Sequence, residues 1–200
     1  MKSRTIKVLA ALAAVLLGAG VFSVTFWQAT VVAPQEPEAA VQPQPLMGDA
    51  SPQDLPSRLR IPSLGIDTNV QHVGVGKTGN MAVPTNYTDV GWYRLGTVPG
   101  FVGSAVMDGH VDNGLALPGV FKQLNQIKKG DELFVDTAGG ATRRFVVQEV
   151  ALYPYQEVPL QKLFSRADQA RLNLVTCDGA WVQGAKTYDH RLVVYATLAS

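Results

Sequence analysis

Arg171-Leu-Asn-Leu-Val-Thr-Cys-Asp-Gly179 is an apolar run that ends in a cysteine followed by a turn dipeptide. Apolar and β-branched residues bounded by Asp-Gly are typical of a β-strand that enters a turn. Because side chains alternate between the two faces of a strand, Cys177 shares a face with Asn173 and Val175. The sequence therefore predicts a strand whose last residue is Cys177, with the thiol where the strand meets a loop.

Short runs of the same kind cover the chain on both sides of this strand. Hydrophobic residues make up 46% of the chain and charged residues only 16%, with 19 Gly and 12 Pro. This composition suits a loop-rich β protein better than a helical bundle. Helical pattern is brief, over 119–127 and 159–170. Candidate strands with turns between them predict a closed or nearly closed, eight-stranded all-β barrel. Their ranges are 58–66, 69–75, 81–84, 104–110, 132–136, 143–153, 171–177 and 189–198.

The N-terminal part of the chain has the pattern of a membrane anchor. Residues 8–27 carry no charge, and at about 1.5 Å per residue such a helix crosses the roughly 30 Å hydrocarbon core of a bilayer. Three basic residues precede this run, which places the N-terminus in the cytoplasm. We expect a cytoplasmic tail over 1–7 and a single transmembrane signal anchor over 8–28, with the rest of the chain outside the cytoplasm at the cell membrane. A cleaved signal peptide is the alternative.

Residues 29–57 are rich in Pro, Glu, Gln and Ala and show no apolar periodicity. Such a segment stays extended, so we predict an extracytoplasmic stalk that ends where the folded domain, 58–200, begins. The formal net charge is +1 without a basic block, which excludes the electrostatic footprint of a nucleic-acid-binding protein.

Cys177 is the only cysteine, so it forms no intrachain disulfide. A lone cysteine is commonly a small buried hydrophobe, and a catalytic one needs a basic or cationic neighbour because a free thiol has a pKa of about 8.5. His110 is the best-placed histidine: it closes the run 104–110 after Gly109, which allows close backbone approach, and Asp108 and Asp112 could orient its ring.

Arg191 opens the last predicted strand, about ten residues after Cys177. An antiparallel return would bring it beside the cysteine, where its fork of donors suits a developing oxyanion. An ordinary surface cation is the alternative for this arginine. We interpret His72 and His190 as structural.

Gly109-His110-Val-Asp, Leu174-Val-Thr-Cys177 and Arg191 together resemble the sortase family. Sortases carry a Thr-Leu-x-Thr-Cys signature, from which this chain departs at Asn173. The run Ile61-Pro-Ser-Leu-Gly-Ile also resembles the opening of many sortase domains, and Val90-Gly-Trp-Tyr precedes the His strand as it does in the family. The resemblance covers 59–198, and details around His110 are similar to classes E and F.

The resemblance implies a sortase-like β-barrel transpeptidase that cleaves an LPxTG-type sorting signal between Thr and Gly. Cys177 would form a thioacyl intermediate, His110 would transfer protons, and Arg191 would hold the substrate carbonyl. The partners implied are secreted proteins with a C-terminal sorting signal and an amine acceptor, either a lipid-linked peptidoglycan precursor or a pilin lysine. Water competes as an acceptor. The residues expected to bind substrate are Thr176, Val158, Pro159, Leu160 and Leu163. The sequence predicts no metal and no cofactor.

Two alternatives remain at this point. One is an anchored β-barrel interaction module in which Cys177 is buried and inert. The other is an L,D-transpeptidase-like enzyme, whose cysteine follows a Ser-His-Gly-type run, whereas Thr176 and Asp178 flank Cys177 here.

Overall fold

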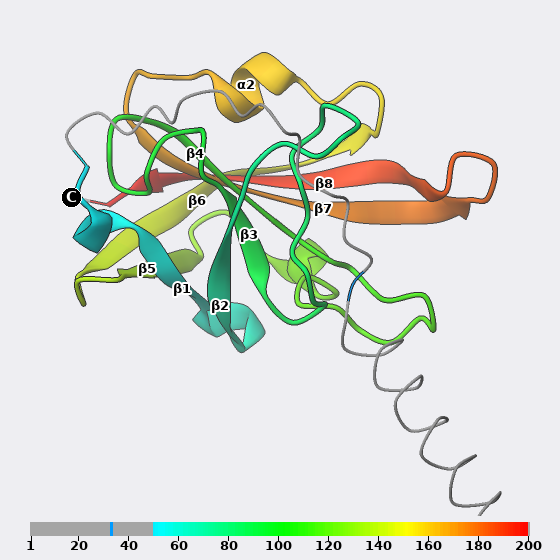
Figure 1. Ribbon diagram of the computed structural model, residues 1–200, viewed down its shortest axis with the longest axis horizontal. Helices are drawn as coiled ribbons and strands as arrows, with labels where there is room; N and C mark the ends of the chain where they lie inside the picture. The colour runs from blue at the N-terminus through cyan, green and yellow to red at the C-terminus, as the bar shows by residue number, and fades with distance from the viewer. Residues whose placement is uncertain (1–32, 34–49, 200) are drawn as a thin grey trace, which may run out of the picture.

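Eight strands form a closed barrel in the computed structural model, which describes residue 33 and residues 50–199 (Figure 1). The order around the barrel is β1-β2-β3-β4-β7-β8-β6-β5, and β5 pairs with β1 to close it. The β2–β3 and β4–β7 pairs are parallel and the other pairs are antiparallel. The strands are β1 Pro56–Ile61, β2 Ile66–Val73, β3 Val90–Tyr93, β4 Gly103–Gly109, β5 Glu132–Thr137, β6 Thr142–Pro154, β7 Ala170–Val182 and β8 Thr187–Leu198. The predicted all-β barrel is confirmed.

Two of the strand predictions are wrong in detail. Residues 81–84 form no strand; only an isolated bridge joins Met81 to Val75. The missing strand is Val90–Tyr93, which pairs with both β2 and β4. This strand has a weak sequence signal because it is short and contains Gly91, and Gly lowers strand propensity.

The strand that carries the cysteine does not end at Cys177, which corrects a second prediction. β7 continues to Val182, with a register shift against β8 between Asp178 and Trp181. Gly179 has a φ of 86°, so the Asp-Gly pair that reads as a turn is a bulge within a long hairpin. Figure 1 shows this β7–β8 hairpin extending beyond the body of the barrel.

Alternation along the strands divides the barrel into an inner and an outer face. Leu172 and Leu174 of β7 point into the main core with Met107 of β4 and Phe145 of β6. On the outer face, Val106 and Val193 pack with Leu163 in a smaller cluster. The barrel interior is thus a packed core, and reactive groups on these strands lie on its outer face.

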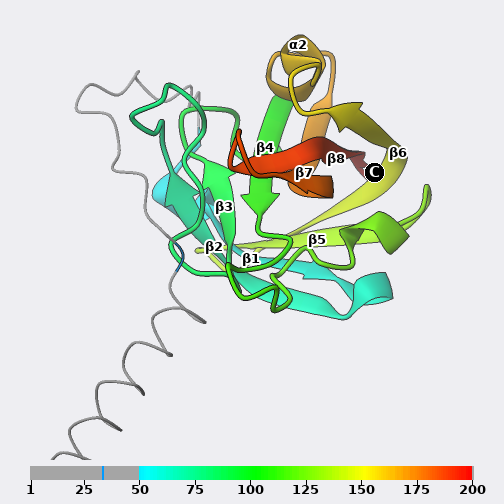
Figure 2. The same cartoon turned by 90° about the vertical axis from the view of Figure 1, so that its right-hand side faces the viewer.

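The helical segments are shorter than the sequence predicts. Within 159–170 the structure has only α2, Leu160–Phe164, and within 119–127 only the 3-10 helix η3, Leu124–Gln126. The two other 3-10 helices, η1 Pro52–Asp54 and η2 Pro62–Leu64, flank β1. Figure 2 shows α2 outside the barrel, on the side of β4 and β7. Asn173 of β7 holds it there by donating from Nδ2 to the Leu163 carbonyl at 2.6 Å.

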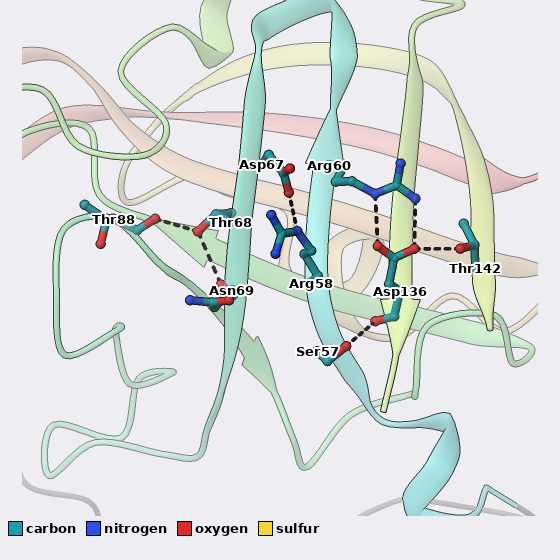
Figure 3. A network of polar contacts seen from close by, with 9 residues as sticks. All are labelled: Ser57, Arg58, Arg60, Asp67, Thr68, Asn69, Thr88, Asp136 and Thr142. Atoms are coloured by element: carbon teal, nitrogen blue, oxygen red, sulfur yellow. Dashed lines mark hydrogen bonds and ion pairs between the residues drawn. The ribbon is translucent and has the colours of Figure 1, made fainter. Parts of the chain in front are cut away.

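A polar network covers the outer face of β1, β2 and β5 (Figure 3). Arg60 donates two hydrogen bonds of 2.9 Å to the two carboxylate oxygens of Asp136. Thr142 donates to the same carboxylate at 2.6 Å, and Arg58 pairs with Asp67. Adjacent strands on this side are therefore joined by matched charges as well as by the backbone ladder.

The predicted tail and anchor and most of the predicted stalk lie outside the described residues. Within the described residues, no helix is long and apolar enough to cross a membrane. Ala33 is buried, and its backbone N–H donates to the Thr85 carbonyl at 2.9 Å.

Candidate active site

Cys177 and Arg191 are direct partners across the β7–β8 pair. The antiparallel return predicted from the sequence is thus present, with the register that places the two residues side by side. Cys177 shares a face with Val175, which packs against the outer cluster. The thiol therefore lies on the outer face of the barrel, next to an arginine.

His110 directly follows β4, which runs parallel to β7 on the other side from β8. The register pairs Asp108 with Val175, and its continuation by two residues brings His110 level with Cys177. Thr176 donates from Oγ1 to the Gly109 carbonyl at 2.7 Å, which ties the two strands together at this point. The Thr176 side chain is buried, so its hydroxyl supports the site from within.

The backbone around His110 depends on two glycines. A Cβ on Gly109 would lie 2.6 Å from the ring of Phe121, and a Cβ on Gly119 would lie 2.3 Å from the carbonyl oxygen of His110. The close approach predicted for Gly109 is therefore confirmed. Gly119 serves the same purpose, although its position in the sequence gave no sign of it.

The His110 ring contacts Pro84 and Tyr87. Its Nε2 lies 3.3 Å from the Pro84 carbonyl oxygen, and the two ring centroids of His110 and Tyr87 are 4.9 Å apart. A carbonyl oxygen only accepts, so Nε2 carries the hydrogen and Nδ1 is the basic nitrogen of the neutral ring. Burial lowers the pKa of His110 below its usual value, and the Pro84 hydrogen bond and the nearby Asp112 charge partly oppose this.

The expectation that Asp108 and Asp112 orient the ring is not met. Asp108 is buried, and its Oδ1 has no hydrogen-bond partner. Burial raises the pKa of Asp108 well above its usual value, so the group is a neutral acid. Asp112 instead accepts a hydrogen bond of 2.6 Å from the Tyr188 hydroxyl and lies 3.6 Å from Lys122 Nζ.

Burial also raises the pKa of the Cys177 thiol, and the charge of Asp112 adds to this, while Arg191 and a hydrogen bond from the Tyr188 backbone N–H lower it. The resting site therefore holds a neutral thiol beside a neutral imidazole. The thiolate forms when the thiol proton moves to the ring, which suits a nucleophile and base that work as a pair.

The Arg191 guanidinium lies folded against the hairpin. Nη1 donates to the carbonyl oxygens of Tyr188 at 3.0 Å and His190 at 2.8 Å, and Nη2 donates to Thr187 Oγ1 at 2.8 Å. Its Cζ lies 5.7 Å from the centre of the Tyr155 ring. These backbone carbonyls thus hold the Arg191 guanidinium in a fixed position beside Cys177.

Tyr188 is the site residue that the sequence analysis missed. Its N–H reaches the Cys177 sulfur, its carbonyl accepts from Arg191, and its hydroxyl reaches Asp112 in the loop after His110. Tyr188 thus contacts Cys177, Arg191 and the loop that follows His110. Tyr188 and Asp112 are 76 residues apart in the chain, a separation at which sequence pattern gives no signal.

Of the five predicted substrate-binding residues, Thr176 is buried in β7, and the other four lie in or beside α2 but differ in exposure. Leu160 is 63% exposed and Val158 is half-buried, whereas Leu163 is buried against the outer cluster. Pro159 is the residue before α2 and is half-buried. Leu163 and the half-buried Val158 both pack in or against the outer cluster, and Leu160 is the most exposed residue of the four.

The two other histidines have their own partners. His72 Nε2 lies 2.8 Å from the Pro56 carbonyl oxygen and its ring meets Trp92 edge-on. His190 Nδ1 lies 2.7 Å from Asp189. Among residues 33 and 50–199, no three His, Cys, Asp or Glu side chains come together as metal ligands.

Comparison with known proteins places this arrangement in a family. A family model described as the sortase domain matches residues 59–199, more than half of the chain. A comparison with curated protein sequences finds no match.

Solved structures with the same fold include sortase A from Corynebacterium diphtheriae, a lid mutant, at 22% identity and a TM-score of 0.57, with 73% of this chain and 70% of that one covered. Sortase C-1 from Actinomyces oris is 25% identical with a TM-score of 0.54, and 76% of each chain is covered. Sortase C-1 from Streptococcus pneumoniae is 20% identical with a TM-score of 0.56, covering 72% and 66%. These are class A and class C names, and the assignment to class E or F stays a prediction. The matched domain identifies the chain as a member of the sortase family of cysteine transpeptidases.

Proposed function

We propose that this protein cleaves an LPxTG-type sorting signal between Thr and Gly and transfers the new acyl end to an amine. The observation that carries the proposal is the cross-strand pairing of Cys177 with Arg191, with His110 level with them on the adjacent strand. A thiol, a base and a cation on one face are the groups that acyl transfer requires.

In the first step the Cys177 proton passes to His110, and the thiolate attacks the Thr carbonyl carbon. Arg191 donates hydrogen bonds to the oxygen as negative charge develops on it. The tetrahedral intermediate then collapses, the C–N bond breaks, and the His110 imidazolium gives its proton to the leaving Gly nitrogen. A thioester to Cys177 remains.

The apolar Leu-Pro part of the signal would lie on the α2 side of Cys177. Leu160, which is 63% exposed, and the half-buried Pro159 offer apolar surface there, and Val158 packs against the outer cluster beside them. Leu163 and Thr176 act below this surface, through packing and through the bond to Gly109.

The partners in this proposal are secreted proteins with a C-terminal sorting signal, and a lipid-linked peptidoglycan precursor or a pilin lysine as acceptor. The uncharged run over 8–28 would anchor the protein in the cell membrane, with the tail 1–7 in the cytoplasm and the stalk 29–57 outside. Both kinds of substrate are available on the outer side of that membrane.

Cleavage of an LPxTG-type peptide by the full-length protein and by Cys177→Ala tests this function. The wild-type protein should release the Gly-containing fragment, and Cys177→Ala should release none. Because Cys177 is the only cysteine, iodoacetamide labelling of the native protein reports on it alone. Full activity of Cys177→Ala would sink the proposal, and labelling only after unfolding would favour the interaction module with an inert cysteine.

A further inference from the structure

A cavity lies on the outer face of β6, β7 and β8, away from Cys177. Its volume is about 370 Å³, within the range of roughly 300–1,000 Å³ that small-molecule sites have. Its walls include Glu149 of β6, Arg171 of β7 and Tyr195 of β8. Arg171 precedes Cys177 by six residues of β7, which at about 3.3 Å per residue places the two roughly 20 Å apart. The cavity is therefore separate from the candidate active site.

Four cationic side chains line this cavity. Lys129 lies in the segment before β5, Lys162 lies in α2, Arg166 follows α2, and Arg171 is near the start of β7. Glu149 is the one carboxylate among the described residues that line it. The walls are thus strongly basic, unlike the mostly apolar walls of an ordinary small-molecule pocket.

Arg171 is the buried cation of the four. Its side chain is only 10% exposed, and Nε and Nη2 donate to the Asp168 carboxylate at 3.1 and 2.6 Å. The Gln169 side-chain oxygen accepts from Nη2 at 2.7 Å and from Nη1 at 3.3 Å. A guanidinium has one N–H at Nε and two at each Nη. One N–H of Nη1 therefore has no acceptor among the described residues.

The carboxylates near the cavity are already engaged with its cations. Glu149 accepts two hydrogen bonds from Lys162 Nζ, of 2.6 and 2.7 Å. Asp168 is shared between Arg166, at 3.1 Å, and Arg171. Hydrogen bonds from Arg171 lower the pKa of Asp168 to about 2, so this carboxylate is fully charged at neutral pH. Neither acid is available to a further cation.

Lys129 has no carboxylate partner among the described residues. Four cations against two carboxylates leave a surplus of two positive charges around the cavity. On the outer face of β1, β2 and β5, by contrast, Arg58 and Arg60 are each matched to one aspartate (Figure 3). Ion pairs that served only to join strands would be matched in the same way, so the surplus favours a bound anion.

A phosphate monoester fits these walls better than other ligands. Its phosphate carries a charge of about −1.5 to −2 and three acceptor oxygens, which suits a surplus of two charges and donors from separate elements. A carboxylate is planar and is satisfied by a single arginine, and an apolar ligand would leave the cations unpaired. Gln148 and Thr197 add uncharged polar groups to the walls for the organic part of an ester.

We propose that this cavity is a binding site for a phosphate monoester, whose phosphate oxygens accept hydrogen bonds from Lys129, Arg166 and Arg171. Soluble esters such as glycerol 1-phosphate and the headgroup of phosphatidate share this chemistry. The site is independent of the function proposed above, because none of its residues touches Cys177, His110 or Arg191.

Isothermal titration calorimetry of the full-length protein in a nonionic detergent tests the site. The probes are glycerol 1-phosphate, glycerate, which has a carboxylate in place of the phosphate, and glycerol. Glycerol 1-phosphate should bind, glycerate should bind about tenfold more weakly because it offers less charge and fewer acceptor oxygens, and glycerol should not bind.

Charge variants show whether the binding takes place in this cavity. Lys129→Glu should weaken binding of glycerol 1-phosphate about tenfold, because repulsion replaces attraction, and Arg166→Gln should weaken it about two- to fivefold. Lys128→Glu is the matched control: it makes the same change in net charge on the neighbouring exposed residue, outside the cavity. Salt screens that more distant charge, so binding should stay within about twofold of wild type.

Mixed micelles distinguish the two sources of phosphate. Weaker binding of glycerol 1-phosphate in micelles with phosphatidate than in micelles with phosphatidylcholine would assign the cavity to a lipid headgroup, and equal binding would assign it to soluble esters. No binding of glycerol 1-phosphate, glycerate binding of equal strength, or equal losses in Lys129→Glu and Lys128→Glu would overturn the site. Absence of an acyl adduct on Cys177 would overturn the proposed function and leave these titrations unchanged.

Discussion

The outer face of β1, β2 and β5 and the outer face of β4, β7 and β8 belong to one barrel, but the first stabilises the charged forms of its ionisable side chains and the second stabilises their neutral forms. On the first face, hydrogen bonds from Arg60 lower the pKa of Asp136, and those from Arg58 lower the pKa of Asp67. On the second face, burial is the largest influence: it raises the pKa of Asp108 and Cys177 and lowers that of His110.

This difference in protonation state means that one face contributes to folding stability and the other to the reaction. Matched charges on β1, β2 and β5 hold their groups ionised, which favours the folded state. Burial on β4 and β7 holds ionisable groups neutral, which does not favour folding but keeps a thiol and an imidazole ready to exchange a proton. The two faces should therefore respond differently to substitution, with activity sensitive at one and stability at the other.

The largest expected effect is that of Arg191→Ala. Loss of the guanidinium should lower kcat/KM for peptide cleavage by about 10²- to 10³-fold, the usual effect of removing a donor to a developing oxyanion. Steady-state cleavage of an LPxTG-type peptide measures it, and Arg191→Lys, which keeps the charge without the fork of donors, should recover only part of the loss. Activity within twofold of wild type would remove Arg191 from the mechanism.

Gly119→Ala should have the next largest effect. The new Cβ would lie 2.3 Å from the His110 carbonyl oxygen and 2.7 Å from its carbonyl carbon, so His110 must shift. Since displacement of a catalytic group by about 1 Å can lower the rate up to a hundredfold, we expect a loss of about ten- to a hundredfold in kcat/KM.

Gly114→Ala is the matched control, because a Cβ there meets nothing within 4 Å. It should retain wild-type kcat/KM. Equal losses in the two variants would show that the loop tolerates no alanine anywhere, and the packing of Gly119 on His110 would not explain the result.

The pH profile should show a smaller, graded effect. The state with one proton shared between Cys177 and His110 dominates between their two pKa values, the one lowered from 6.5 and the other raised from 9.0. A plot of kcat/KM against pH should thus be a broad plateau that falls in acid below 6.5 and in base above 9.0. Alkylation of Cys177 follows the thiolate alone and should still rise with pH near 9.0. An alkylation rate already constant around neutral pH would contradict the raised thiol pKa.

The smallest expected effect on catalysis is that of Asp136→Ala on the opposite face. It removes the two bonds from Arg60 and the bond from Thr142, and it should lower the free energy of unfolding by about 1 kcal/mol, since the pair is partly exposed. Urea denaturation measures the loss, while kcat/KM should stay within about twofold of wild type. A large fall in activity without a fall in stability would break the division between the two faces.

The sequence predicted most of the barrel because its signals are local. Apolar runs of strand length located seven of the eight strands, and the spacing of Cys177 and Arg191 was short enough for an antiparallel return to align them. The end of β7 was misjudged because Asp178-Gly179 is a turn signal by composition, although in the barrel it forms a bulge. Local residue preference could not distinguish the two.

The parts of the site that the sequence did not predict depend on contacts between distant segments. The Tyr188–Asp112 bond, the contact between His110 and Pro84, and the packing of Gly119 on His110 arise only when the loop after β4 folds against the hairpin and the β2–β3 connection. Leu163 was expected to bind substrate but is buried, because in a helix as short as α2 the buried face cannot be assigned from periodicity.

The most direct test of the account is intact-mass spectrometry of the full-length protein quenched during turnover of an LPxTG-type peptide, followed by mapping of the modified residue. The account predicts an acyl adduct on Cys177 that ends at the Thr of the peptide, disappears when an amine is added, and is absent from Cys177→Ala. Efficient cleavage with no adduct on Cys177, or an adduct on another residue, would contradict it.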